Sequence, residues 1–208
     1  MPDAVPDPTP KATEQALATT PLSLLERIRA NEPDAWRRLL DLYQPLVRFW
    51  CMRGGLAPED MADVVQEVFA GVAGGMGGFR RDRPGDTFRG WLRGIARNQI
   101  LLFHRRNRDR VAAEGGSDAL WNIQQIADPL PPPDDDESLQ IGQVYQRALE
   151  QVRVDFEERT WSAFWLTVIE GRAPATLTAQ LGMTVAGIRQ AKSRVLRRIK
   201  IEVGDLVD

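Results

Sequence analysis

The stretch "FRGWLRGIARNQILLFHRRNRDR", residues 88–110, decides the fold of the first half of the chain. On a helical wheel its large apolar side chains share about 120° of arc, and a neighbouring arc is basic. The apolar arc holds Phe88, Trp91, Leu92, Ile95, Leu102 and Phe103, and the basic arc holds Arg89, Arg93, Arg97, His104 and Arg108. The pattern predicts one helix that packs its apolar face on a domain core and turns its cations outward.

A row of cations at helical-turn spacing suits a sugar-phosphate backbone, because each neutralised phosphate releases counterions. The preceding loop adds Phe79, Arg80 and Arg81, and an aromatic ring among cations is typical of surfaces that bind single-stranded nucleic acid. Taken alone, the segment could equally be an ordinary amphipathic helix whose arginines are solvated. Other parts of the chain have to decide between the two interpretations.

The helix expected at about 58–73 has the opposite charge. One face is apolar, with Met61, Val64, Val65, Val68, Phe69 and Val72, and the other carries Glu59, Asp63, Gln66 and Glu67. An acidic surface repels DNA, so a protein partner is the more economical interpretation. The glycine-rich segment 73–87 that follows predicts a loop.

The last part of the chain, "RAPATLTAQLGMTVAGIRQAKSRVLRRIK" (172–200), predicts a helix-turn-helix. Residues 175–181 form the short first helix, Gly182 supplies the turn, and Thr184 caps the second helix. Its expected packing face is Ile188, Val195, Leu196 and Ile199, and its expected outward face is Arg189, Gln190, Ser193, Arg194 and Arg197. Similar helical hairpins also occur in proteins that do not bind DNA.

Composition limits the function classes. The chain of 208 residues holds 27 basic and 29 acidic residues, yet ten arginines lie within 80–110 and six cations without an acid lie within 184–200. Two separate basic islands favour nucleic-acid binding more than the near-neutral net charge suggests. One cysteine and one histidine predict neither a disulfide framework nor a metal site, and no apolar run is long enough to span a membrane. The N-terminus lacks a signal-peptide pattern, so a cytoplasmic protein without cofactor is expected.

These patterns predict an all-α fold of two small helical domains on a flexible linker. The expected divisions are an N-terminal tail at 1–21, a first domain at 22–110, a linker at 111–138 and a helix-turn-helix domain at 139–204. The linker contains a triple proline followed by four acids, which cannot bury a core. Trp121, Ile123 and Ile126 are expected to dock as a short helix.

Three segments together resemble the sigma factors of bacterial RNA polymerase, specifically the small extracytoplasmic-function group of the sigma-70 family. "DMADVVQEVFAGV" (60–72) resembles the region 2.2 helix, and "TFRGWLRGIARNQILLFHRRNRD" (87–109) resembles regions 2.3–2.4. "RTWSAFWLTVIEGRAPATLTAQLGMTVAGIRQAKSRVLRRI" (159–199) is similar to region 4. The resemblance covers about 24–110 and 139–204, and the order of the segments is more specific than any one motif.

The resemblance implies a non-enzymatic subunit that gives core RNA polymerase its promoters. Asp60, Asp63, Gln66 and Glu67 would bind the clamp helices of the β′ subunit. Phe79, Arg80, Arg81, Arg89, Arg93, Arg97, His104, Arg105 and Arg108 would engage the −10 element. Thr184, Arg189, Gln190, Lys192, Ser193, Arg194, Arg197 and Arg198 would read the −35 element.

Further partners follow from the same resemblance. The polymerase β flap would bind the second domain, and an anti-sigma factor is an additional candidate partner, whereas a membrane and a small-molecule substrate are not expected. The linker would run near the RNA exit path, with its acids at 134–137 mimicking nucleic acid.

Two other function classes stay open. A stand-alone helix-turn-helix regulator with a sensor domain would explain residues 172–200, but it requires neither the acidic helix nor the basic one. A nuclease or hydrolase could use Asp60, Asp63 and Glu67 as metal ligands, but no nucleophile–base pair accompanies them.

Overall fold

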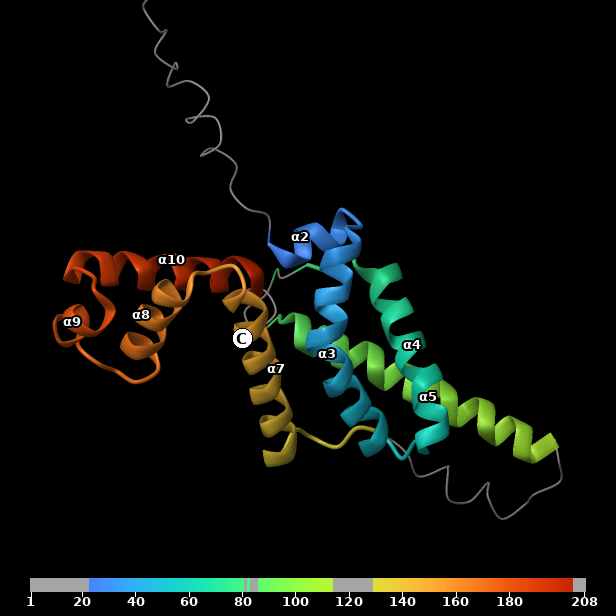
Figure 1. Ribbon diagram of the computed structural model, residues 1–208. Helices are drawn as coiled ribbons and strands as arrows, with labels where there is room; N and C mark the ends of the chain where they lie inside the picture. Colours follow the sequence, from blue (N-terminus) through green and yellow to red (C-terminus); the bar gives the residue numbers. More distant parts are fainter. Residues whose placement is uncertain (1–22, 81, 83–85, 114–128, 204–208) are drawn as a thin grey trace, which may run out of the picture.

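The structure, a computed structural model, describes residues 23–80, 82, 86–113 and 129–203 (Figure 1). Within these ranges all regular elements are helices and none is a strand, which confirms the expected all-α class. The predicted tail, Arg81, and the expected short helix around Trp121, Ile123 and Ile126 lie outside the described residues.

Four helices form the first half of the chain: α2 (Leu24–Arg29), α3 (Pro33–Arg53), α4 (Pro58–Gly75) and α5 (Phe88–Ala113). Two of them begin at a proline, where the missing N–H costs no helical hydrogen bond, as the sequence predicts for Pro33 and Pro58. Ser23 and Glu26 form a reciprocal capping box at the start of α2.

The core of this half is made by α3, α4 and α5, and α2 adds Leu24, Leu25 and Ile28. The valines of the apolar face of α4 are buried, and α5 buries Phe88, Leu92, Ala96 and Ile100, one residue per turn. The ring centroid of Tyr43 lies 5.3 Å from that of Phe88, edge to face. Leu102, which the wheel predicts in the core, is 39% exposed. On the wheel Leu102 stands outside the arc that Phe88, Leu92, Ala96 and Ile100 bury, whereas its neighbour Phe103 lies within this arc and packs against the core.

The second half comprises α7 (Asp135–Arg153), α8 (Glu158–Val168), η2 (Pro174–Leu177), α9 (Thr178–Leu181) and α10 (Val185–Val203). Gly182 has φ 58° and ends α9 in the left-handed conformation that favours glycine. The Thr184 hydroxyl accepts a 3.0 Å hydrogen bond from the amide of Gly187. Both details confirm the predicted turn and cap of the helix-turn-helix.

The packing face of α10 differs from the predicted one at two positions. Ile188, Ala191 and Val195 are fully buried, whereas Leu196 is 40% exposed. At about 100° per residue, Leu196 stands some 80° from Ile188, at the edge of the apolar arc. Ala191, which the prediction left out, extends the buried face on its other side and belongs to one cluster with Ala163 and Leu177 of the helices beneath it.

Helix α7 joins the two halves. It packs along α3 (Figure 1), and its Val144 and Ala148 belong to the core of the first half together with Leu130. One turn further, Val152 belongs to the core of the second half. The helix begins at Asp135, four residues before the predicted start of the second domain, so the acids that were expected in the linker lie at its N-terminus.

Two glycines lie where α4 crosses α5. A Cβ on Gly75 would approach Cζ2 of Trp91 to 2.8 Å, and a Cβ on Gly71 would approach Cγ2 of Ile95 to 3.0 Å. The loop predicted from residue 73 therefore starts later, since α4 continues to Gly75. Helix propensity disfavours glycine, but here the close approach of α5 leaves no room for a larger residue.

Gly75→Ala and Gly74→Ala form a matched pair that tests this contact. A Cβ on Gly74 meets no atom within 4 Å. We expect Gly74→Ala to stabilise the protein by about 0.5–1 kcal/mol through helix propensity. Gly75→Ala should instead destabilise it by about 1–3 kcal/mol, because the Trp91 ring must move. Urea denaturation followed by circular dichroism measures both, and equal stabilisation in the two variants would contradict the close packing.

Candidate protein- and nucleic-acid-binding surfaces

The acidic surface is built by α4, whose buried valines turn the opposite face outward. Asp63, Gln66 and Glu67 are exposed and Asp60 is partly exposed. These four side chains, all predicted from the sequence, line one open hollow. The hollow also contains Gln99, Phe103 and Arg106 of α5, which the sequence could not assign to this surface because their place depends on how α5 crosses α4.

The basic face of α5 is less uniform than its wheel suggests. Arg105 is exposed, while Arg89, Arg97 and Arg108 are partly buried. The single histidine turns away from this row: Nε2 of His104 lies 2.8 Å from the carbonyl oxygen of Gly54. This contact holds the end of α3 against α5. The His104 ring is therefore not presented to a ligand in this conformation.

Arg93, in the middle of the predicted row, is held within the chain. Its Nε lies 3.4 Å from a carboxylate oxygen of Glu137, and its Nη2 donates to the carbonyl oxygen of Pro131. Both partners precede or begin α7. One of the cations predicted to face DNA is thus covered by the segment that leads into the second half.

Phe79 lies elsewhere than the sequence suggests. The prediction places its ring on the surface, where bases could stack, but it is only 5% exposed. Its centroid lies 4.8 Å from that of Trp91 and 5.8 Å from that of Phe88. Aromatic packing with these two rings outweighs the polar surroundings of the loop.

An aromatic edge is nevertheless present at this place. Trp91 is only partly buried and lines an open hollow with Arg80 and Thr87. Arg80 is exposed, and its Nη1 donates to the carbonyl oxygens of Gly77 and Phe79. The structure thus pairs an exposed cation with a tryptophan, where the sequence predicted a phenylalanine.

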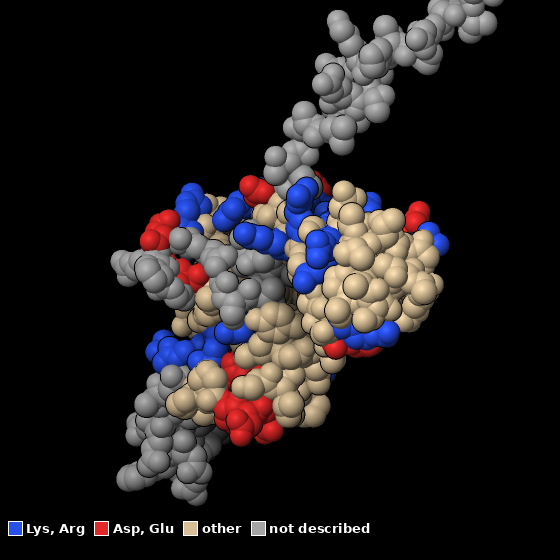
Figure 2. Space-filling model, turned by 90° about the vertical axis from the view of Figure 1, so that its left-hand side faces the viewer, with Lys and Arg blue, Asp and Glu red and all other residues tan. Residues whose placement is uncertain are grey.

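The second basic surface lies on α10. Arg189, Gln190, Ser193, Arg194 and Arg197 are all exposed and line one open hollow. These are the outward residues predicted from the wheel, which the helix brings together as expected. Figure 2 shows basic side chains in the upper part of one face and again at the lower left, where they adjoin an acidic patch.

The other three residues predicted on this surface lie outside the hollow. Thr184 caps α10, and Lys192 and Arg198 are partly buried. Arg198 pairs with Asp155 at 2.8 Å and with Glu202 at 2.5 Å.

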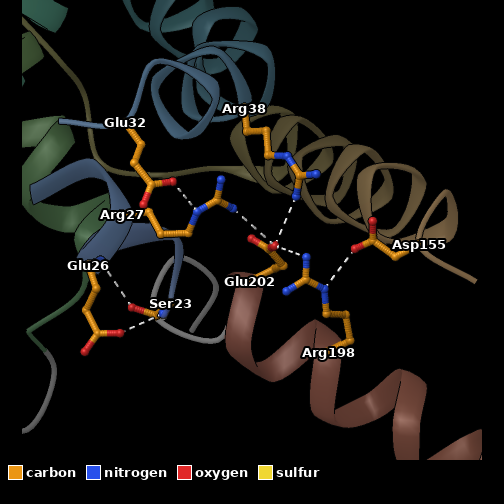
Figure 3. A network of polar contacts seen from close by, with 8 residues as sticks. All are labelled: Ser23, Glu26, Arg27, Glu32, Arg38, Asp155, Arg198 and Glu202. Carbon is orange, nitrogen blue, oxygen red and sulfur yellow. Dashed lines mark hydrogen bonds and ion pairs between the residues drawn. The ribbon is translucent and has the colours of Figure 1, made fainter. Parts of the chain in front are cut away.

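Glu202, in the last turn of α10, is the centre of a buried ionic network (Figure 3). Its side chain is 3% exposed, and one carboxylate oxygen lies 3.0 Å from Arg38 of α3 and 3.6 Å from Arg27 of α2. The pKa of Arg27 is raised, chiefly by its hydrogen bond to Glu32 and also by the charge of Glu202. Sequence reasoning missed this cluster because Arg38 and Glu202 are 164 positions apart and no local pattern links them.

The single cysteine lies in the core of the first half. Burial raises the pKa of the Cys51 thiol to about 11, which disfavours the thiolate that a nucleophile requires. Among the described residues no group of three or more His, Cys, Asp or Glu side chains is arranged to hold a metal ion. No described helix is long and apolar enough to cross a membrane.

Comparison with known families bears on the first half of the chain. Residues 39–110, about a third of the 208 residues, match the family model of sigma-70 region 2. Region 2 is the part of a sigma factor that binds core RNA polymerase and melts promoter DNA. The match supports a sigma factor of the sigma-70 family. No curated protein matches the chain.

Phe79→Ala tests the placement of this ring in the core. Because the side chain is buried among aromatic rings, we expect a loss of about 3–5 kcal/mol of unfolding free energy. Arg80→Ala, at the adjacent exposed position, should change the stability by less than about 0.5 kcal/mol. Chemical denaturation measures the unfolding free energy of both variants. Wild-type stability for Phe79→Ala would contradict the burial of this ring.

Proposed function

We propose that this protein is a sigma factor of the extracytoplasmic-function type, which directs core RNA polymerase to promoters and acts in initiation without catalysing a reaction itself. The observation that carries the proposal is the combination of three surfaces on one helical chain. A region 2 domain presents an acidic face and a basic, aromatic-edged face, and a helix-turn-helix presents a second basic face.

The acidic surface of α4 is the proposed site for the polymerase. Glu67, Asp63 and Gln66 project from a helix that is fixed by its buried valines, so their geometry is set before a partner arrives. Such a surface suits a partner helix with basic side chains, which we assign to the β′ clamp. Electrostatic complementarity there sets specificity and association rate more than affinity.

The −10 element is proposed to bind along the start of α5 and the loop before it. Arg80 offers a cation for the DNA backbone, and the exposed edge of Trp91 offers a surface on which a base can stack. Proteins that bind single-stranded DNA combine these two kinds of contact. Unstacking a base costs a few kcal/mol, which stacking and phosphate contacts can offset. This assignment gives Trp91 the base-stacking role that the sequence predicted for Phe79, because Trp91 reaches the surface and Phe79 does not.

The −35 element is proposed to bind α10 in the major groove. Arg189, Gln190 and Arg194 lie in the first three turns, where a recognition helix meets base edges. Arginine bonded to guanine is the commonest specific contact of this kind.

The β flap is assigned to a hollow on another side of the same domain. The hollow measures about 640 Å³, and its lining combines Leu149, Trp161, Trp165 and Leu166 with polar and charged side chains, so it suits an amphipathic segment.

Glu67→Lys tests the polymerase surface. Reversing the charge should weaken binding to core RNA polymerase at least about tenfold, because it places like charges across a complementary interface. Asp41→Lys makes the same charge change at an exposed position of α3 and should leave binding within about twofold. Fluorescence anisotropy of labelled protein titrated with core polymerase gives both constants, and similar losses in the two variants would contradict the assignment.

Arg194→Ala tests the −35 surface. Loss of one guanidinium should weaken binding of the polymerase complex to its promoter by about 1–3 kcal/mol. The matched change Lys200→Ala removes a cation from an exposed position of α10 outside the hollow, and it should have little effect. Competition binding with promoter fragments selected in vitro measures the difference.

The proposal as a whole is tested by reconstitution. Purified protein is mixed with core RNA polymerase and assayed for co-migration and for initiation on promoter fragments. Initiation that requires both components supports a sigma factor. Tight binding of duplex DNA together with indifference to the polymerase would instead indicate a stand-alone regulator.

A further inference from the structure

Helices α4 and α5 pack against each other as antiparallel neighbours. A Cβ on Gly75 would approach the Trp91 ring. One turn earlier in α4, a Cβ on Gly71 would approach Ile95, which lies one turn later in α5. Each step toward the start of α4 is therefore matched by a step toward the end of α5, and this register leads to the hollow that holds the acidic surface.

The same register explains which residues of α5 share that hollow. Continued by one turn, it brings Glu67 opposite Gln99. About two turns further, Asp60 comes opposite Arg106, and Phe103 lies between the two pairs. The hollow, about 330 Å³, thus follows the line of contact between the two helices and does not belong to α4 alone.

Arg106 lies on the face of α5 that meets α4, and not in the basic row of α5. Ile95 and Gln99 are the residues of α5 nearest to a Cβ on Gly71 of α4. At 100° per residue, Arg106 stands midway between them, about 20° from each. Its side chain is exposed, so its cation is presented to the same partner as the acids of α4.

The hollow contains both signs of charge, and they do not neutralise each other. Asp63, Glu67 and Arg106 are exposed, and Asp60 is partly exposed. Within the part of the chain that the structure describes, none of these four side chains forms an ion pair. Phe103 packs partly on the core of the first half and adds an apolar part to the lining. The surface is thus an acidic row with an apolar middle and a cation at one end.

This lining restricts the kind of partner that fits. A nucleic acid would meet three carboxylates, which repel its phosphates. A helix that carries only cations would pair with the acids but would cover Arg106 without a counterion, and a charge covered without a partner is costly. The partner that fits both signs carries a cation and a carboxylate about two helical turns apart, with an apolar side chain between them.

We propose that the polymerase-binding site extends from α4 onto α5, with Arg106 and Phe103 as further contacts. The partner helix then brings a cation to the acids of α4, an apolar side chain to Phe103 and a carboxylate to Arg106. Arg106 acts as a specificity residue, because it disfavours basic helices that lack the carboxylate. That the partner is the β′ clamp of core RNA polymerase rests on the proposed function.

Arg106→Glu tests the site, because simple attraction between an acidic surface and a basic partner predicts the opposite result. Such attraction would increase with one more acid, whereas the proposed contact with a carboxylate becomes a repulsion. We expect binding to core RNA polymerase at least about tenfold weaker, measured by fluorescence anisotropy of labelled protein without DNA. Unchanged or tighter binding would overturn the proposal.

The matched control is Arg48→Glu. It makes the same charge change at an exposed position of α3 outside the hollow, and it should leave binding within about twofold. A loss as large as that of Arg106→Glu would show an effect of net charge only and would likewise count against the contact.

A charge-reversal rescue separates a direct contact from a folding defect. Each acidic residue of the β′ clamp helices is changed singly to lysine in the core polymerase. One of these changes should weaken wild-type binding and restore Arg106→Glu to within about threefold of the original affinity. A misfolded variant cannot be restored by a change in its partner. Failure of every clamp acid to restore binding would disprove the carboxylate contact.

The outcomes also distinguish this proposal from the function on which it rests. Wild-type protein that does not bind core RNA polymerase would disprove the sigma-factor function and the contact together. Binding that Glu67→Lys weakens and Arg106→Glu does not would keep the function and confine the site to α4.

Discussion

The packing of α5 against α3 and α4 is the constraint on which the charged surfaces depend. One helix buries Leu92, Ala96 and Ile100, and the glycines of α4 allow it to approach closely. That contact fixes the rotation of both helices, so α4 shows only its acidic face and α5 its basic one. The acidic surface of α4 and the basic surface of α5 lie next to each other because the same apolar contact between the two helices orients both.

Local periodicity explains which features could be predicted. The helices, their proline starts, the turn at Gly182 and the outward row of α10 depend on neighbours within one or two turns, which the sequence displays directly. Four acidic-surface residues were found for the same reason. Leu102 and Leu196 were misplaced because both stand at the edge of an apolar arc, and the wheel does not say how wide an arc the packing partner covers.

The features that could not be predicted depend on contacts between distant segments. Phe79 looked like a surface ring among arginines, and only the positions of Phe88 and Trp91 show that it is buried. Glu202 looked like one acid near the end of a basic helix, yet arginines from α2 and α3 surround it. A triple proline followed by acids predicted a flexible linker, but the acids begin α7, whose apolar side completes the core of the first half.

Placing α7 between the halves has a consequence for how they communicate. Its apolar residues belong to both cores, Val144 and Ala148 to the first and Val152 to the second, so neither half can move relative to the other without uncovering some of them. Apolar burial supplies most of the attraction, whereas the ionic contacts at the ends of α7 and at Glu202 set the register. A partner that binds the first half and the helix-turn-helix at separate places therefore acts on an interface in which apolar contacts of α7 and ionic contacts at Glu202 lie together.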